Sequence, residues 1–451
     1  MSKVIKLKQG LDIKLEGEAD AGKVFPVSCD YYAIKPTDFR ALAPRLEVKV
    51  GDAVRAGDPL FADKYRPAIK FTSPVSGVVE AIRRGEKRKI LAVVVKAGEQ
   101  ITYKTFDLPA PGALSAGIVV ERLLESGLWP MIKQRPFDMI ADPATRPKGI
   151  FVSAFDSSPL APDYQTLLKD EARALQAGFD ALNKLSPVPV SLNARAGETR
   201  SPLFDALRGV TINYFSGPHP AGNVGVQIHH LDPLNKGELA WVVSLPDVAL
   251  IGRFFLSGRV DLRRTVALVG SEVAAPACHE TLVGARVGSI VSGKLRDRGH
   301  QRLLSGNVLT GESVDPDSFL GFYHTMITVI PEGDRHEFLG WATPGFHKFS
   351  MSHAFPSFLR PKKRYRLDTN YHGERRAFVI SGQYERVLPV DIFPVYLLKA
   401  ILAGDLEKME QLGIYEVAPE DLALCEFVCT SKIPVQEIVD RGIEIMMKEL
   451  I

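Results

Sequence analysis

The spacing of glycines is the first test of redox chemistry in this chain. A dinucleotide-binding turn contains a Gly-x-Gly pair, which lets the backbone bend sharply and approach a pyrophosphate. No Gly-x-Gly occurs anywhere in the 451 residues. The segment in which we look for a phosphate loop, residues 126–136, instead contains Trp129, Pro130 and Pro136. These side chains fill space and the prolines lack N–H donors, so a conventional NADH or flavin site is not expected.

A second phosphate-binding motif is nearly complete at residues 288–294, which read Gly-Ser-Ile-Val-Ser-Gly-Lys. In a nucleotide-binding P-loop, a Ser or Thr that binds magnesium follows the lysine, but here Leu295 follows it. The polar segment beyond also breaks at Gly299 instead of continuing as an apolar helix. We therefore interpret the segment as a hairpin with glycine corners.

Four cysteines (Cys29, Cys278, Cys425 and Cys429) are scattered along the chain, which fits a reducing cytosol better than a disulfide framework. Cys425 and Cys429 are four residues apart and would share one face of a helix. An iron–sulfur cluster normally takes four thiolates, and the other two cysteines lie far away in sequence. Paired zinc-ligand doublets are also missing. The spacing favours cysteines that pack in a core.

Histidines gather in two places. His219, His229 and His230 lie in or just after a glycine- and proline-rich segment, and His347 and His353 lie among aromatic residues. No serine nucleophile elbow and no carboxylate pair accompanies them. We expect structural hydrogen bonds or contacts between subunits at these positions.

The elements that must position these residues begin with residues 46–79, where apolar and polar residues alternate between glycine corners. This pattern, closed by a strand within residues 86–97, predicts a small flattened β-barrel of the biotinyl/lipoyl type. Lys64 lies between its two halves, where lipoyl domains carry a modified lysine. Pro67 and extra residues disturb that register, so a solvated turn lysine is expected and modification is the alternative.

From residue 148 the chain alternates strands with helices, which predicts a parallel α/β sheet of Rossmann type. Short strands and glycine turns then predict a compact α+β module, and the chain ends in helices. The expected strands are 148–155, 188–193, 210–215 and 239–245, and the expected helices are 116–126, 163–185, 246–257, 392–403, 406–412 and 435–449.

Composition limits the classes of partner. Fifty-six Lys and Arg oppose 53 Asp and Glu, a balance that argues against a nucleic-acid-binding protein. The N-terminus lacks the apolar core of a signal peptide. The most apolar window, residues 239–257, contains Pro246, Asp247 and Arg253, and charges in mid-span are costly in lipid. We therefore expect no transmembrane helix and only peripheral association with a membrane.

Three segments together resemble one family: residues 217–233, beginning Gly-Pro-His-Pro-Ala-Gly-Asn-Val-Gly; residues 303–311, Leu-Leu-Ser-Gly-Asn-Val-Leu-Thr-Gly; and residues 384–392. They resemble the A subunit of the bacterial sodium-translocating NADH:quinone reductase, and the resemblance covers essentially the whole chain. That family is similar in plan to the C subunit of the Rnf complex and to the NADH-binding flavoprotein of respiratory complex I. Those relatives carry a glycine-rich FMN/NADH loop and cluster cysteines. Here Leu128-Trp-Pro-Met stands at the loop, and only Cys425 and Cys429 lie near the end. The resemblance implies a flavoprotein plan that has lost its cofactor sites.

The resemblance also implies a peripheral subunit on the cytoplasmic face of the bacterial inner membrane, with membrane-embedded and flavoprotein subunits as partners. NADH, flavins and an iron–sulfur cluster would belong to those other subunits, and ubiquinone is the candidate ligand of this one. No motif locates a quinone pocket. Aromatic and histidine side chains would suit a quinone ring, and the alternative for them is a core or a subunit interface. The residues concerned are Trp341, Phe346, His347, Phe349, His353 and Phe355.

Two other functions stay open at this stage: a self-contained flavin/NADH oxidoreductase, and a carrier protein acylated at Lys64. The predicted architecture has five parts. They are a barrel-sandwich hybrid module (1–105), a Rossmann-like α/β domain without a dinucleotide loop (106–260), a β-grasp module (261–332), a connecting β-rich segment (333–388) and a C-terminal helical domain (389–451).

Overall fold

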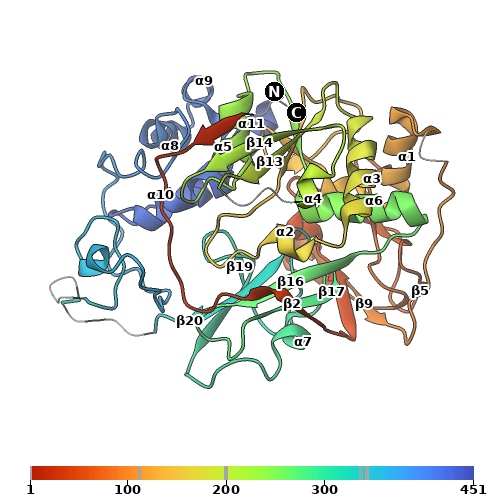
Figure 1. The fold of residues 1–451 in the computed structure, drawn as a ribbon. Helices are drawn as coiled ribbons and strands as arrows, with labels where there is room; N and C mark the ends of the chain where they lie inside the picture. The colour runs from red at the N-terminus through yellow and green to blue at the C-terminus, as the bar shows by residue number, and fades with distance from the viewer. Residues whose placement is uncertain are drawn as a thin grey trace.

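The computed structural model describes residues 3–109, 113–197, 202–334, 337, 339–340 and 345–450. Their strands form a seven-stranded, a six-stranded, a four-stranded and a three-stranded sheet. In Figure 1 the seven-stranded sheet lies at the top, the six-stranded sheet below it, the two small sheets on the right, and the C-terminal helices at the upper left. The chain thus combines mixed α/β sheets with a C-terminal helical region.

The two small sheets form the predicted barrel-sandwich module. One pairs β3 (Tyr31–Ile34), β9 (Ile90–Ala97), β8 (Gly77–Arg84) and β5 (Ala53–Val54), and the other pairs β4 (Pro44–Leu46), β6 (Pro59–Asp63) and β7 (Lys70–Thr72). Their inward side chains have no exposure at Leu60, Phe61, Val79, Val93 and Val95. In β8 the buried Val79 lies between the exposed residues Val78 and Glu80, as the alternating pattern predicts. β6 departs from the pattern, because consecutive residues from Leu60 to Asp63 are buried.

The N-terminal arm pairs with sheets other than those of the barrel. β1 (Val4–Lys6) lies parallel to β14 (Val210–Ser216) at one edge of the seven-stranded sheet. β2 (Asp20–Pro26) lies parallel to β17 (Ala277–Leu282) at one edge of the six-stranded sheet. We expected all of residues 1–105 in one module, and the arm differs because its pairing partners are distant in the sequence.

The seven-stranded sheet has the order β1-β14-β13-β12-β15-β10-β11. Its first five strands are parallel, and β10 and β11 add an antiparallel ribbon. Along the chain, β13 is added beside β12 and β14 beside β13, all in one direction across the sheet. β15 then pairs with the opposite edge of β12. The strand order therefore reverses between β12 and β15. Bounds not yet given are β12 (Ile150–Ser153), β13 (Val190–Arg195), β15 (Ala240–Val242), β10 (Lys133–Arg135) and β11 (Met139–Ile140).

Helices α3 (Ala172–Asn183) and α6 (Leu245–Ser257) pack closely together because each has a glycine at the crossing. A Cβ on Gly252 would lie 1.7 Å from the carbonyl oxygen of Ala174. The helix expected over residues 163–185 is interrupted, since α2 (Tyr164–Leu167) ends before α3 begins. The other helices that accompany the sheet are α1 (Ala116–Ser126), α4 (Pro202–Asp205) and α5 (Val224–Leu231).

The six-stranded sheet has the order β19-β18-β20-β16-β17-β2. Its remaining strands are β16 (Arg263–Val269), β18 (Gln301–Ser305), β19 (Glu312–Val314) and β20 (Met326–Pro331). The hairpin expected at residues 288–294 is wrong, because α7 (Val287–Val291) occupies most of it. Lys294 donates from Nζ to the carbonyl oxygen of Ile290 at 2.6 Å, so a backbone oxygen already engages the lysine of the P-loop-like motif.

The C-terminal part contains α8 (Pro394–Ala403), α9 (Leu406–Gln411), α10 (Ala423–Val428) and α11 (Val435–Leu450). Between residues 345 and 388 the structure has the short 3₁₀ helix Pro356–Leu359 and an isolated bridge from Tyr365 to Leu15, and no named strand. For the described residues of this stretch, the β-rich character that we expected is therefore wrong. Pro356 and Pro361 lack N–H donors, and the contacts of this stretch with distant segments are isolated hydrogen bonds and ring contacts instead of strand ladders.

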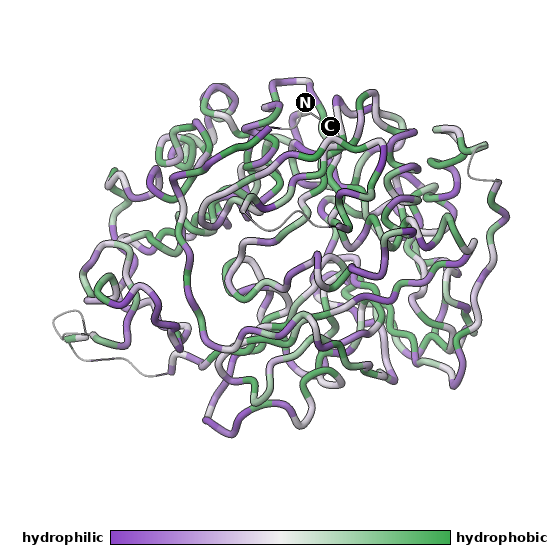
Figure 2. Tube along the Cα trace, in the orientation of Figure 1, coloured by the Kyte–Doolittle hydropathy of each residue, from purple (hydrophilic) through white to green (hydrophobic). Residues whose placement is uncertain are grey.

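Figure 2 shows hydrophilic residues interspersed with hydrophobic ones along the helices. Among the described residues, no helix combines the length and the apolar character needed to cross a membrane.

Candidate functional site

A cleft of about 210 Å³ opens at the carboxyl ends of β12 and β15. In open α/β sheets the ligand crevice lies where the strand order reverses, which is this point of the seven-stranded sheet. Residues directly after the two strands form its walls. They are Phe155, Asp156 and Ser158 after β12, and Val243, Ser244 and Asp247 after β15.

The N-terminus of α6 lies at this cleft, and side chains of the chain itself already occupy the place of a bound anion there. Ser244 caps the helix, since its Oγ accepts a hydrogen bond from the backbone N–H of Asp247 at 3.2 Å. The Asp247 carboxylate forms a buried ion pair with Arg264. A carboxylate thus lies where a bound anion would use the helix dipole.

Residues 128–131, at the position of the expected phosphate loop, form a packed wall. Trp129 is fully buried, and its Nε1 donates to the carbonyl oxygen of Ala141 at 2.7 Å. Its ring meets that of Trp241 edge to face, with centroids 5.5 Å apart. The Tyr323 hydroxyl donates to the carbonyl oxygen of Pro130 at 2.6 Å, and Met131 lines the cleft.

The turn after β12 is the other place where a phosphate loop would be expected in such a sheet, and the sequence patterns did not single it out. Residues 153–160 read Ser-Ala-Phe-Asp-Ser-Ser-Pro-Leu and contain no glycine. Asp156 accepts a hydrogen bond from the backbone N–H of Ser158 at 2.7 Å, which takes up a donor that could otherwise face a phosphate. The sequence could have indicated this turn by its position, because it directly follows β12, the first strand of the region in which strands alternate with helices.

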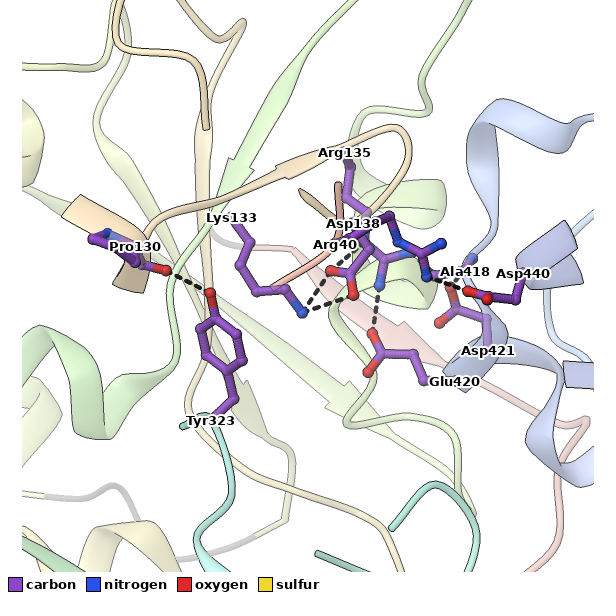
Figure 3. A network of polar contacts seen from close by, with 10 residues as sticks. All are labelled: Arg40, Pro130, Lys133, Arg135, Asp138, Tyr323, Ala418, Glu420, Asp421 and Asp440. Atoms are coloured by element: carbon purple, nitrogen blue, oxygen red, sulfur yellow. Dashed lines mark hydrogen bonds and ion pairs between the residues drawn. The ribbon is translucent and has the colours of Figure 1, made fainter. Parts of the chain in front are cut away.

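A charged network lies beside the cleft and joins three parts of the chain (Figure 3). Lys133 of β10 contacts Asp138 at 2.7 Å. Arg135, also on β10, pairs with Glu420 and, at 3.1 Å, with Asp421. Arg40 of the barrel module reaches Asp440 of α11 at 2.5 Å. Three cations therefore face four carboxylates.

The network shifts the pKa values of two of its carboxylates, Asp138 and Glu420, in opposite directions. Burial alone would raise the pKa of Asp138, but Lys133 and Arg135 outweigh it and lower that pKa to about 2. Burial, together with Asp421 and Asp138, raises the pKa of Glu420 to about 7 in spite of the attraction of Arg135. Glu420 lines the cleft with its side chain 39 % exposed, so solvent screens part of this shift.

The chain matches known proteins over nearly its whole length. Three family models fit it: the NqrA N-terminal barrel-sandwich hybrid domain over residues 5–98, the NqrA second alpha/beta domain over 114–260, and the NQRA C-terminal domain over 265–315. The A subunit of the Na(+)-translocating NADH-quinone reductase of Pseudomonas aeruginosa is 38 % identical over 432 residues, which cover 95 % of this chain and 96 % of that protein. The chain belongs to the NqrA family.

More distant members align over nearly the full length as well. The A subunit of the Rhodopirellula baltica enzyme is 36 % identical over 451 residues, covering 99 % of this chain and 98 % of its own. Among solved structures, an NAD+-reducing [NiFe]-hydrogenase aligns over 76 % of this chain and 62 % of its own, with a TM-score of 0.41 and 13 % identity. That similarity is too distant to inform function.

The histidines of the NqrA-family motif at residues 217–233 hold segments together. His219 is 4 % exposed, with Nδ1 3.0 Å from Oγ of Ser157, and burial lowers its pKa although Asp156 and Asp12 oppose the shift. His229 contacts Glu416 at 2.6 Å, and His230 contacts the carbonyl oxygen of Pro389 at 2.9 Å. These contacts confirm the structural hydrogen bonds expected for the three residues.

Of the predicted quinone-lining residues, the five that the structure describes lie along one segment, and none of them lines the cleft. Trp341 lies outside the described residues. Phe346 is 60 % exposed, and Phe349 packs on Tyr365 with ring centroids 5.6 Å apart. The ring of His353 lies 4.8 Å from that of Phe358, Phe355 lies under the ammonium group of Lys348, and His347 is exposed. A quinone pocket in this segment remains a prediction.

The four cysteines of the NqrA-family chain are buried and free. The Tyr384 hydroxyl donates to Sγ of Cys429 at 3.0 Å, and burial raises the pKa of Cys425 well above its ordinary value. Cys425 and Cys429 both belong to the apolar core of the C-terminal helices, as we expected. The prediction that they share one helix face is wrong, because α10 ends at Val428 and Cys429 follows in extended backbone. No group of three or more His, Cys, Asp or Glu side chains able to hold a metal ion occurs among the described residues.

Proposed function

We propose that this chain is a peripheral subunit of a sodium-translocating NADH:quinone reductase, on the cytoplasmic face of the membrane. In this proposal it binds membrane-embedded and flavoprotein subunits, which carry the NADH, flavin and iron–sulfur sites. The observation that supports it most strongly is 38 % identity to named A subunits over 95 % of the chain. We further propose that the α/β domain is a Rossmann-like fold and residues 261–332 a β-grasp module, and that the chain contributes to quinone binding.

The cleft supports the cofactor-free part of this proposal. Pyrophosphate needs a glycine turn, open backbone donors and positive potential. Here the lining contains Asp138, Asp156, Asp247 and Glu420, and its cation Lys133 is paired with Asp138. Asp247 and Glu420 are in turn paired with Arg264 and Arg135. Among the described residues, the lining therefore offers a nucleotide phosphate neither an unpaired Lys or Arg nor a Gly-x-Gly turn, and we expect no dinucleotide in this cleft.

Two locations compete for a quinone ring. One is the predicted aromatic segment with Phe346, Phe349 and Phe355. The other is the cleft, which offers the features typical of small-molecule sites: it is concave, and polar groups from Tyr164, His219 and Ser158 converge on it. Ser158 is 7 % exposed and its hydroxyl has no hydrogen-bond partner among the described residues.

The test is a titration of the purified chain with a soluble ubiquinone analogue, followed by Trp fluorescence, with NADH as the control ligand. The three tryptophans allow the site to be located. W341F retains the buried pair Trp129 and Trp241, which packs beside the cleft. Saturable quenching that persists in W341F and weakens in Y164F would assign the quinone to the cleft. Quenching that disappears in W341F would assign it to the aromatic segment.

Two further measurements separate this proposal from a self-contained oxidoreductase. We expect no flavin absorbance in the purified chain, no NADH oxidation by it, and co-purification with affinity-tagged membrane subunits when all are expressed together. A yellow chain that oxidises NADH alone would overturn the cofactor-free assignment. Failure to co-purify with the other subunits would overturn the assignment to the complex.

A further inference from the structure

Residues 345–366 have an unusual charge for an otherwise balanced chain. They contain six basic residues and not one acidic residue, although the whole sequence has a net charge of only +3. The segment lies at the left edge of the molecule in Figure 1, on the side opposite the barrel. The basic residues are Lys348, Arg360, Lys362, Lys363, Arg364 and Arg366.

One side of this segment is anchored to the body of the protein. Tyr365 is 4 % exposed, and its backbone N–H donates to the carbonyl oxygen of Lys14 at 2.8 Å. Arg366 donates from Nε to Oε1 of Glu272 at 2.7 Å, and the Glu272 side chain has no exposure. Phe349 packs on Tyr365 and Phe427. The segment is therefore held in place by part of its side chains only.

The other side presents large apolar residues next to cations. Phe346, Phe358 and Leu359 are 60 %, 52 % and 69 % exposed. Nζ of Lys363 donates to the carbonyl oxygen of Phe346 at 2.8 Å, which brings the basic run beside that ring. Arg360, next to Leu359, and Lys362 are exposed and form no ion pair with any described residue, and Lys362 also lines the rim of a groove that contains Asp12 and Glu18. Exposed apolar groups of this size beside unpaired cations mark a surface that meets a partner.

We propose that this face of residues 345–366 docks on an anionic phospholipid surface. Phe346, Phe358 and Leu359 would enter the headgroup region, and Arg360 and Lys362 would meet lipid phosphates. Aromatic and leucine side chains beside Lys and Arg are the composition of interfacial membrane anchors. Lys348, Arg364 and Arg366 are paired with Glu337, Glu18 and Glu272 from outside the segment, which leaves the other three basic residues as its net positive charge. A segment that brings no carboxylate of its own matches a surface of negative charge.

The inference adds a direct lipid contact to the peripheral position proposed above, and it rests on that proposed function for its biological role. The test uses the full chain and vesicles of two compositions, phosphatidylcholine alone and an equal mixture with phosphatidylglycerol, with binding measured by co-sedimentation. We expect binding to the anionic vesicles that is at least about tenfold stronger and that declines with added salt.

Two pairs of variants test the two kinds of contact. Each basic residue near an anionic surface contributes roughly a fivefold gain, so R360E/K362E should weaken binding by at least about tenfold. F358S/L359S should weaken it by about tenfold because the apolar insertion is lost. The matched controls change equally exposed residues elsewhere. One is K87E/R88E on the barrel, and the other is F393S/Y396S at the start of α8, where the two rings are 66 % and 52 % exposed. Both controls should bind within about twofold of the parent chain.

Thermal melting verifies that all four variants fold. Equal binding to both vesicle types, or equal losses in the control variants, would overturn the inference. If the parent chain ignores vesicles but R360E/K362E no longer co-purifies with the other subunits, the surface binds protein and the lipid assignment is wrong. A chain that joins the complex without binding lipid contradicts this inference alone, and one that binds lipid without joining the complex contradicts the proposed function alone.

Discussion

Nη1 of Arg135 lies 3.1 Å from Oδ2 of Asp421, and this pair connects the seven-stranded sheet to the C-terminal helices. The two side chains are 3 % and 0 % exposed. Glu420 binds the same guanidinium group, and Asp421 also accepts the backbone N–H of Ala418 at 2.9 Å. Two segments that are far apart in the sequence are thus joined by charges that water hardly reaches.

Removal of this guanidinium group should destabilise the protein strongly. Arg135→Met keeps most of the side-chain volume but leaves Asp421 and Glu420 without their cation. Breaking one side of a buried ion pair costs about 3–5 kcal/mol. Urea unfolding followed by far-UV circular dichroism measures the change. The control is Lys236→Met, which removes an exposed ion pair with Glu410 and should cost less than about 1 kcal/mol. Equal losses in both variants would contradict the buried role of Arg135.

Glu420→Gln should change how stability depends on pH. The pKa of Glu420 is raised from 4.5 to about 7, so the folded chain keeps a proton that the unfolded chain has released. Stability from this group therefore falls as pH rises from about 4.5 to about 7. A glutamine cannot ionise, so the melting temperature of the variant relative to the parent should rise between about pH 5 and about pH 8. Since the side chain is 39 % exposed, we expect a change of only about 1 kcal/mol.

Two comparisons make that measurement specific. Glu99→Gln alters an exposed carboxylate on the barrel and should leave the pH profile unchanged. Asp138 affects stability in a different pH range. Its pKa is lowered from 3.8 to about 2, so its contribution to stability is lost as pH falls from about 3.8 to about 2. A constant difference between E420Q and the parent from about pH 5 to about pH 8 would show that Glu420 has an ordinary pKa.

Elements defined by local signals were predictable from the sequence. Helix α1 begins and ends as expected because Ser115 caps it with its side chain and Gly127 adopts a left-handed conformation at its end. The alternating residues of 46–79 likewise predicted the barrel strands. The short helix α7 was missed because glycines at residues 288 and 293 indicate a turn more strongly than five residues indicate a helix.

Long-range contacts were beyond the sequence patterns. Nothing near Val4 indicates that β1 pairs with β14, and nothing near Asp138 indicates that Glu420 and Asp421 approach it. The missing glycine loop argued against a dinucleotide, but the carboxylate lining that supports the same conclusion comes from four separate segments. Tertiary packing brings these together, and local periodicity carries no information about it.

Lys64 should carry no biotin or lipoate. The turn that contains it is held by Asp63, a residue that is 1 % exposed. Its carboxylate accepts hydrogen bonds from the backbone N–H of Tyr65 at 3.1 Å and from Nε of Arg66 at 3.0 Å. The backbone N–H of Lys64 donates to the carbonyl oxygen of Ala43 at 2.7 Å. We expect the intact mass of the chain to equal that of the unmodified sequence. An added mass that is absent from Lys64→Gln would establish the carrier function instead.

The crossing of α3 and α6 should tolerate no Cβ. A Cβ on Gly252 would lie 1.7 Å from the carbonyl oxygen of Ala174, and one on Gly178 would lie 2.2 Å from that of Val248. Gly252→Ala or Gly178→Ala must push the helices apart at a cost of about 1–3 kcal/mol, seen as a lower urea midpoint. The matched control is Gly117→Ala in α1, where a Cβ meets nothing within 4 Å and helix propensity should add about 0.5–1 kcal/mol. Opposite signs at the crossing and in α1 are the expected result, and a stabilised Gly252→Ala would show that the two helices do not cross this closely.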